Sequence, residues 1–286
     1  MGRFHRLLLA AFVLAAVAGA RAQVETEPVS PASAQIAPSV PLVERAADKA
    51  YPADAPSWMD PLRGHLEVGT RITVFNLIDK ERSSESEASF LGRIRKLEED
   101  PDYLPTKLFA AWMFNPNVGL ELSLDRMSME TFNRSEDDFD VFIAGDGTLD
   151  VSAICLTLFG RYVNESVFAP YGGAGLAYLW GDFNEDAWWF YNYPDEATYV
   201  AAGSPQQANK GFTREISLDS SLGYLGVLGT AVALTDSWYL DLYARLLIGT
   251  LDAKFRKERK GSEVTGDDGE FPVDSWTLGA GVRYAF

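Results

Sequence analysis

The chain of 286 residues is poor in the residues on which many kinds of protein site depend, since it holds one cysteine and two histidines. A single cysteine cannot form an internal disulfide, which excludes disulfide scaffolds and zinc sites built from cysteine alone. One of the histidines, His5, lies at the extreme N-terminus. Few residues are therefore available for catalysis or metal binding by histidine.

Basic residues are also in short supply. The chain has 25 lysines and arginines against 41 acidic residues, a formal net charge of −16. Binding to a nucleic-acid backbone needs a basic face, so we expect no nucleic-acid partner. The hydrophobic content of 47% is nevertheless too high for a chain that is disordered as a whole.

The N-terminal apolar stretch, Leu7 to Ala20, is too short to cross a bilayer comfortably. It follows the basic residues Arg3 and Arg6 and ends in the small-x-small sequence Ala20-Arg21-Ala22. This arrangement predicts a signal peptide over residues 1–22 that is removed from the mature protein. The alternative is an anchor helix.

Residues 23–62 hold seven of the chain's 14 prolines, with alanine and serine filling much of the rest. No regular apolar period survives in this stretch, which predicts a flexible, disordered tail on the periplasmic side. We interpret it as a spacer, with binding of a partner as the alternative.

From Leu66 onwards, apolar residues recur with a period of two, which is typical of β-strands. In the closing segment, Trp276, Leu278, Ala280, Val282 and Tyr284 alternate with small or charged residues. The same pattern predicts an all-β fold of eight strands, at roughly 65–78, 105–114, 118–132, 149–163, 168–182, 214–235, 238–256 and 272–286.

The connections between these strands alternate in length. Three are short turns, near 115–117, 164–166 and 236–237, and four are long, at about 79–104, 133–148, 183–213 and 257–271. Short turns at one end and long loops at the other are typical of outer-membrane barrels. Residues 63–286 are therefore predicted to form an eight-stranded antiparallel transmembrane β-barrel, with long outer loops and both termini in the periplasm of a bacterium.

Charged residues of the strands fall on one face, and apolar residues fall on the other. A lysine or arginine on the lipid face at mid-depth costs about 2–4 kcal/mol, so the charged face is predicted to point into the lumen. The alternative is a soluble barrel, with inside and outside exchanged. The predicted lumen-facing charges are Glu67, Arg71, Lys107, Glu121, Asp125, Arg161, Asp219, Asp241, Arg245 and Arg283. For Arg245 we expect Asp241, or a carboxylate across the lumen such as Glu121, as the partner.

Aromatic residues gather at strand ends, as the two girdles of a lipid interface require. They comprise Trp112, Phe114, Tyr162, Trp238 and Phe286 at the short-turn end, and Tyr178, Trp180 and Trp276 at the long-loop end. Tyr284 and Phe286 close the chain in the manner of an assembly signal for the barrel-assembly machinery. A further aromatic group, predicted to lie in the third outer loop, is Trp188, Trp189, Phe190 and Tyr191.

Three segments resemble the OmpW family of small outer-membrane proteins. Residues 107–122 (KLFAAWMFNPNVGLEL) are similar to the family's second hairpin, residues 170–178 (PYGGAGLAY) to its fifth strand, and residues 274–286 (DSWTLGAGVRYAF) to its closing strand. The resemblance covers about 65–286 and implies a narrow, largely apolar passage for small hydrophobic molecules. Two departures concern the outer end: residues 146–150 (DGTLD) stand where the family has Leu-Pro-Pro-Thr, and the third loop is bulkier.

Some eight-stranded outer-membrane barrels are lipid-modifying enzymes, whose acyl chemistry needs a base beside a serine. His65 is predicted at the periplasmic rim, and no His-x-Ser sequence exists. Cys155, between Ile154 and Leu156, is interpreted as a buried, inert thiol. The acidic runs at 136–140 and 267–270 lack calcium-loop spacing and are interpreted as solvated loop charge, with binding of a divalent ion as the alternative. We expect no enzyme activity, no cofactor and no metal.

Two functions remain open. The first is a passive outer-membrane channel for small hydrophobic molecules, and the alternative is a structural or surface-recognition barrel with a plugged interior, acting through its outer loops. An eight-stranded barrel is just wide enough for side chains to fill it, so the interior at mid-height distinguishes the two. The expected partners are outer-membrane lipid, lipopolysaccharide, the barrel-assembly machinery and small hydrophobic ligands.

Overall fold

The computed structural model describes residues 62, 64–82, 89–100, 106–132, 145–164, 166–206 and 211–286. The predicted signal peptide, nearly all of the predicted tail at 23–62 and the acidic run at 136–140 lie outside the described residues. No helix in the described part of the chain is long and apolar enough to cross a membrane.

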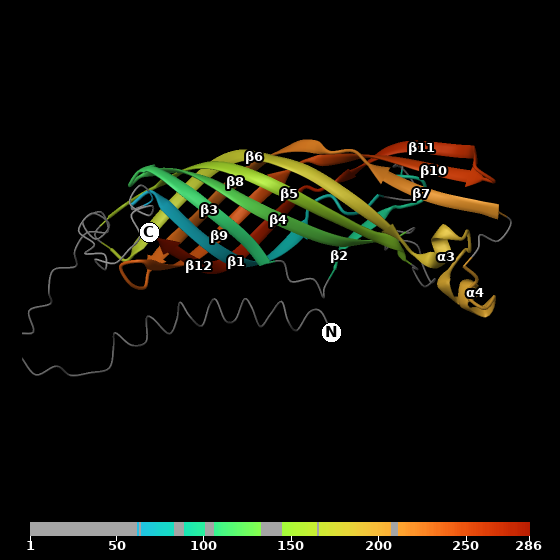
Figure 1. The fold of residues 1–286 in the computed structure, drawn as a ribbon, viewed down its shortest axis with the longest axis horizontal. Coiled ribbons are helices and arrows are strands. Elements are labelled where there is room, and N and C mark those ends of the chain that lie inside the picture. The colour runs from blue at the N-terminus through green and yellow to red at the C-terminus, as the bar shows by residue number, and fades with distance from the viewer. Residues whose placement is uncertain are drawn as a thin grey trace, which may run out of the picture. The chain divides into compact units, whose positions relative to one another are not determined.

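Eight antiparallel strands close into a barrel, as the alternation predicted (Figure 1). Neighbours in the sheet follow the order β4, β3, β1, β12, β9, β8, β6, β5, and pairing between β4 and β5 completes the circle. The barrel strands are β1 (Leu66–Leu77), β3 (Thr106–Asn115), β4 (Val118–Phe132), β5 (Gly145–Arg161), β6 (Phe168–Glu185), β8 (Ser221–Ala233), β9 (Trp238–Ile248) and β12 (Ser275–Ala285).

Alternating burial along each strand sets which face points outward. On β4, Leu122 and Leu124 are 49% and 53% exposed, whereas Glu121 and Asp125 are buried. Cross-strand pairing extends these leucines into apolar rows: Leu122, Leu156 and Leu176 in one, then Leu124, Ile154 and Tyr178 in the next. The outer wall thus carries an exposed apolar belt around a charged interior, the reverse of a soluble barrel.

Three further strands form a second sheet, which we call the outer sheet: β7 (Phe212–Leu218), β10 (Thr250–Arg259) and β11 (Ser262–Pro272), in the order β11, β10, β7. Each continues a barrel strand after a short break, at residues 219–220, 249 and 273–274. The strands predicted at 214–235 and 238–256 are therefore two strands each. The predicted loop at 257–271 is wrong, because most of it is a β-hairpin.

The other long connections also contain ordered structure. A short strand, β2 (Lys96–Glu99), pairs with the outer end of β4. The connection after β6 contains two short helices, α3 (Ala187–Phe190) and α4 (Glu196–Ala201). Asp195 caps α4, since its carboxylate accepts a hydrogen bond of 2.7 Å from the backbone N–H of Thr198.

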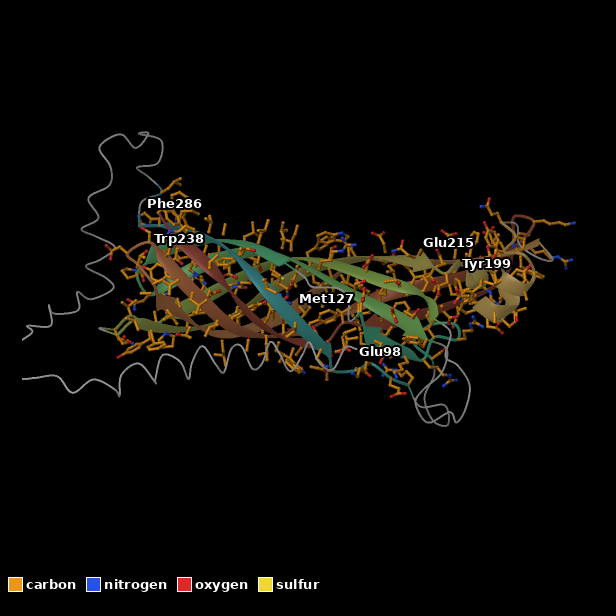
Figure 2. All side chains as sticks on the ribbon, turned by 90° about the horizontal axis from the view of Figure 1, so that it is seen from below. Glu98, Met127, Tyr199, Glu215, Trp238 and Phe286 are labelled. Carbon is orange, nitrogen blue, oxygen red and sulfur yellow. The ribbon has the colours of Figure 1, made fainter. Side chains whose placement is uncertain are left out.

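The two ends of the barrel differ in their aromatic residues. Figure 2 shows Trp238 and Phe286 at one end, with Glu215 and Tyr199 at the opposite end. At the first end, the ring of Tyr284 lies 5.0 Å from that of Trp238 and 5.0 Å from that of Phe286. At the other end of the apolar belt, Tyr178, Trp180 and Trp276 are all exposed. Both predicted girdles are present, while the assembly role of Tyr284 and Phe286 stays a prediction.

Gly281 lets the closing strand approach β1. A Cβ atom at this position would lie 2.0 Å from the carbonyl oxygen of Thr70 and 2.8 Å from the Cα of Arg71. Any side chain here would collide with the backbone of β1 rather than with a movable side chain. Glycine at this point of β12 leaves the room in which Arg71 turns into the lumen.

Candidate functional site

Nine of the ten charges predicted to face the lumen are buried inside the barrel, each no more than 8% exposed. These are Glu67, Arg71, Lys107, Glu121, Asp125, Arg161, Asp241, Arg245 and Arg283. Asp219 is a correction to the prediction. Its side chain is 58% exposed and pairs with Lys254 at 2.6 Å on the outside. The break between β7 and β8 changes the register at this point, and a slip of one residue moves a side chain to the other face.

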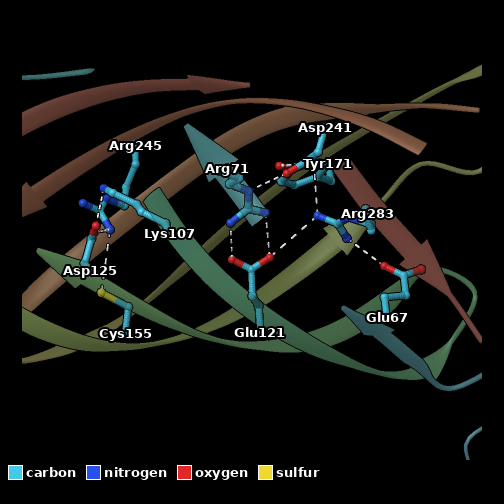
Figure 3. Close-up of polar contacts among 10 residues, drawn as sticks. All are labelled: Glu67, Arg71, Lys107, Glu121, Asp125, Cys155, Tyr171, Asp241, Arg245 and Arg283. Atoms are coloured by element: carbon cyan, nitrogen blue, oxygen red, sulfur yellow. Dashed lines mark hydrogen bonds and ion pairs between the residues drawn. The ribbon is translucent and has the colours of Figure 1, made fainter. Parts of the chain in front are cut away.

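Arg71 lies at the centre of the larger group of charges (Figure 3). Its two terminal nitrogens donate to the two carboxylate oxygens of Glu121 at 2.6 and 2.8 Å, and its Nε donates to Asp241 at 2.5 Å. The first contact is bidentate, the strongest arrangement for this pair of side chains. These bonds join β1, β4 and β9 across the lumen.

Arg283 extends the same group towards the short-turn end. Its guanidinium contacts Glu67 at 2.7 Å, Asp241 at 3.1 Å and Glu121 at 3.7 Å. Arg161 donates to both oxygens of Glu67, at 2.8 and 2.6 Å. We call these six residues the three-arginine network: Glu67, Arg71, Glu121, Arg161, Asp241 and Arg283. Its three cations and three carboxylates balance in charge.

Aromatic rings cover the flat faces of the network's guanidinium groups. The Cζ of Arg71 lies 3.8 Å from the ring centroid of Phe109 and 4.6 Å from that of Tyr243. The Cζ of Arg283 lies 4.9 Å from Phe109 and 5.4 Å from Tyr171, whose hydroxyl donates to Asp241 at 2.9 Å. Because carboxylates occupy the edges of the arginines and rings occupy their faces, the cross-section of the barrel is filled at this level.

A second group, the Asp125 cluster, lies further towards the outer end and consists of Lys107, Asp125 and Arg245. The Asp125 carboxylate forms ion pairs with both cations. Arg245 also donates to Cys155 Sγ at 3.7 Å and to Thr277 Oγ1 at 3.4 Å. Arg245 thus pairs with a carboxylate across the lumen, as expected, because β4 lies opposite β9 in the barrel; that carboxylate is Asp125, whereas Asp241 and Glu121 belong to the three-arginine network.

Beyond the Asp125 cluster, the interior becomes apolar. Met127, Leu149, Val151, Leu179 and Leu247 are each no more than 1% exposed and belong to one continuous buried cluster.

The same apolar cluster reaches the aromatic residues of α3. Trp188 and Trp189 are 4% and 2% exposed, while Phe190 and Tyr191 are half-buried. The ring of Trp189 lies 6.1 Å from Phe183 and 5.9 Å from Phe255 of the outer sheet. The predicted outer-loop aromatics thus divide into two that are buried at the outer end and two that reach the surface.

The other residues considered for chemistry have structural contacts. The Nδ1–H of His65 donates a 2.8 Å hydrogen bond to the carbonyl oxygen of Met113, and its ring stacks on Trp112 at the short-turn end. Cys155 is 1% exposed. Among the described residues, no group of three or more histidine, cysteine, aspartate or glutamate side chains is arranged to hold a metal ion.

Asp146, at the outer end of β5, is a buried acid that the alternation of apolar residues did not mark as a site residue. Its side chain is fully buried and forms an ion pair with Arg93 at 2.5 Å. The guanidinium of Arg93 in turn lies 5.3 Å from the ring of Trp188. Burial raises the pKa of Asp146 to about 6, an effect that the charge of Arg93 only partly offsets.

This pKa predicts the direction in which pH changes the stability of the outer end. Since the folded state holds the proton of Asp146 more tightly than the unfolded state, stability should fall as pH rises from about 4 to about 6. Asp146→Asn should remove this part of the pH dependence, measured as unfolding midpoints by tryptophan fluorescence at pH 4, 5, 6 and 7. Asp252→Asn, at an exposed position, serves as control. If the unfolding midpoints of wild type and Asp146→Asn differed by the same amount at every pH in this range, Asp146 would not have the raised pKa.

No family model and no curated protein sequence matches the chain. Among solved structures, it is similar to the outer-membrane protein OprG from Pseudomonas aeruginosa, with a TM-score of 0.52 and 16% identity over 78% of this chain and 96% of OprG. The outer-membrane protein AlkL, determined in lipid bilayers, gives a TM-score of 0.46 and 14% identity over 84% of this chain and 96% of AlkL. Escherichia coli outer-membrane protein W gives a TM-score of 0.35 and 17% identity over 77% of this chain and 97% of that protein. The likeness to OprG shows a shared fold and confirms, at that level, the resemblance that the sequence motifs indicated.

Proposed function

We propose that this chain is a bacterial outer-membrane protein with a closed, plugged barrel, which acts through the outer sheet and helices α3 and α4. The observation that carries this proposal is the three-arginine network, which fills the cross-section with paired charges and aromatic rings. The sequence left two functions open, and a plug at mid-height favours the structural or surface-recognition barrel.

The placement in the membrane is part of the proposal. The exposed apolar belt and the two aromatic girdles fit a lipid bilayer, and the outer sheet continues three barrel strands beyond one girdle. On this view, the short turns and both termini face the periplasm. Outer-membrane lipid and lipopolysaccharide surround the belt, and the barrel-assembly machinery reads Tyr284 and Phe286.

Passage through such an interior is energetically costly. A molecule that crosses the network must separate guanidinium groups from carboxylates that are less than 10% exposed. Losing one partner of a buried ion pair typically costs about 3–5 kcal/mol, and the network would lose several at once. The plug therefore favours a barrel that is closed to permeation over an open channel.

A second candidate function is transport of small hydrophobic molecules, which one observation favours. The buried apolar cluster runs from Met127 and Leu247 inside the barrel to Phe183 and Trp189 at its outer end. A small apolar molecule would find matching surroundings there if those side chains moved apart. It would still meet the Asp125 cluster and the three-arginine network before it reached the periplasm.

Uptake by vesicles distinguishes the two functions. Purified protein in liposomes should admit labelled hydrophobic probes no faster than empty liposomes, because the plug stays closed. Detergent lysis of the same liposomes gives the maximum signal. Uptake that increases with the amount of protein would favour the second candidate and refute the closed barrel.

Surface labelling on intact cells tests the orientation. Single cysteines or peptide tags are introduced near Gly203, after α4, and near Ser262, in the β10–β11 hairpin. Both should be labelled by a membrane-impermeant reagent on intact cells. Tags near Asn117, in the β3–β4 turn, and Ser237, in the β8–β9 turn, should react only after the outer membrane is opened. Labelling of the second pair on intact cells would invert the topology.

A further inference from the structure

The outside of the barrel wall carries a polar groove with a volume of about 710 Å³. It forms where β6 has no hydrogen-bonded strand on one side, because the pairing of β6 with β8 ends at Leu179 and Ser221, and β7 pairs with β10 instead. Six polar residues from four strands line it: Arg126 of β4, Asp150 and Ser152 of β5, Asp182 and Asn184 of β6, and Ser217 of β7.

The register of the sheet fixes the height of this groove relative to the apolar belt. Arg126, Ser152 and Trp180 pair in one row, directly outward of the row formed by Leu124, Ile154 and Tyr178. Tyr178 and Trp180 are exposed, with ring centroids 5.9 Å apart. The groove therefore begins where the belt ends, at the level of lipid headgroups on the side of the outer sheet.

The groove presents planar polar groups side by side. Arg126 contacts Asp150 Oδ2 at 3.2 Å, and the Asn184 amide donates to the same oxygen at 3.3 Å. Both contacts use one carboxylate oxygen, so Oδ1 keeps its capacity as an acceptor. Within the described part of the chain, no side chain pairs with the Asp182 carboxylate. Guanidinium, amide, carboxylate and hydroxyl groups together supply donors and acceptors for the neighbouring hydroxyls of a sugar.

We infer that this groove binds the sugar headgroup of lipopolysaccharide in the outer leaflet, while its acyl chains lie on the apolar belt below. Two carboxylates beside one arginine disfavour a bare phosphate, whereas sugar hydroxyls can donate to the carboxylates and accept from the arginine and the amide. A volume of this size falls in the usual range of small-molecule sites. The inference needs the outer-membrane placement but not the closed interior.

Deacylated lipopolysaccharide, which keeps the sugars and loses the acyl chains, is the probe that isolates this site. Protein in neutral-detergent micelles should bind it saturably in a calorimetric titration. Asp150→Ala should weaken binding about tenfold or more, as expected for loss of hydrogen bonds to a charged group. Ser217→Trp should have a similar effect by filling the groove. Asp268→Ala is the matched control, because Asp268 also forms a 3.2 Å exposed ion pair, with Arg256 of the outer sheet.

Four results would overturn the inference. They are no saturable binding by the wild type, equal weakening by Asp268→Ala, unchanged affinity of Asp150→Ala and Ser217→Trp, or binding of inorganic phosphate with the same dependence on Asp150. Retained binding of a dephosphorylated probe supports recognition of the sugar. A heat-dependent gel shift verifies that each variant is folded. Vesicle uptake is measured separately. The absence of sugar binding would therefore not contradict the closed barrel, and uptake of probes by vesicles would not contradict sugar binding in the groove.

Discussion

Arg283→Leu is expected to lower the free energy of unfolding by about 3–5 kcal/mol or more, the usual cost of leaving a buried charge without its partner. Arg283 is 1% exposed and contacts Glu67, Asp241 and Glu121. Its removal leaves three carboxylates with two arginines in a space where water cannot compensate. Urea unfolding in detergent micelles, followed by the heat-dependent gel shift, measures the loss.

Arg256→Leu provides the matched control for this substitution. Arg256 lies on the outer sheet, where its side chain is 33% exposed and its partner Asp268 is 75% exposed. Exposed ion pairs contribute about 0–1 kcal/mol, so this variant should unfold almost as the wild type does. If Arg283→Leu were equally mild and also conducted ions, the interior would be a water-filled pore rather than a plug.

The second large effect is expected at Asp125, which is the only carboxylate of its cluster. Asp125→Asn keeps the shape of the side chain but leaves Lys107 and Arg245 as two buried cations without an anion. We expect a loss of about 3–5 kcal/mol in the same urea assay.

The Asp125 cluster has two cations and one carboxylate, so substitutions of its members should change the free energy of unfolding by different amounts. Lys107→Met removes the surplus cation and leaves one Asp125–Arg245 pair, so it should be nearly neutral or stabilising. Replacing all three residues, as Lys107→Met, Asp125→Leu and Arg245→Leu, should recover most of what Asp125→Asn loses. Equal losses for Lys107→Met and Asp125→Asn would mean that Lys107 contributes to stability as much as the acid does.

Local alternation was sufficient to predict the barrel, because each transmembrane strand meets lipid on one face and the lumen on the other. That contrast predicted the inward position of charges such as Arg71 and Glu121 and the outward position of Leu122. It fails at Asp219, since β7 and β10 leave the barrel and meet water. Alternation does not reveal the break that changes the register there.

The partners of the charges lay beyond the reach of sequence patterns. Arg71 and Asp241 are 170 positions apart, and Arg93 and Asp146 are 53 apart. Which carboxylate meets which arginine depends on the tilt and stagger of closed strands, and neither is visible in a periodicity. The sequence therefore indicated a set of buried charges and a partner for Arg245 across the lumen, but it did not indicate which carboxylate that partner is.

The three-arginine network also affects the order of folding, because it joins the first and last strands of the barrel. Glu67 lies in the first barrel strand and Arg283 in the last, 216 positions apart, so their ion pair forms only when β12 docks on β1. Until then, Glu67 and Asp241 lack a cation that they have in the finished protein. Contacts of such long sequence separation slow folding, and here the docking of β12 on β1 also brings in the last cation of the network. A nascent chain that stops before Arg283 leaves three carboxylates with two arginines, so we expect an incomplete barrel to be less stable than the complete one.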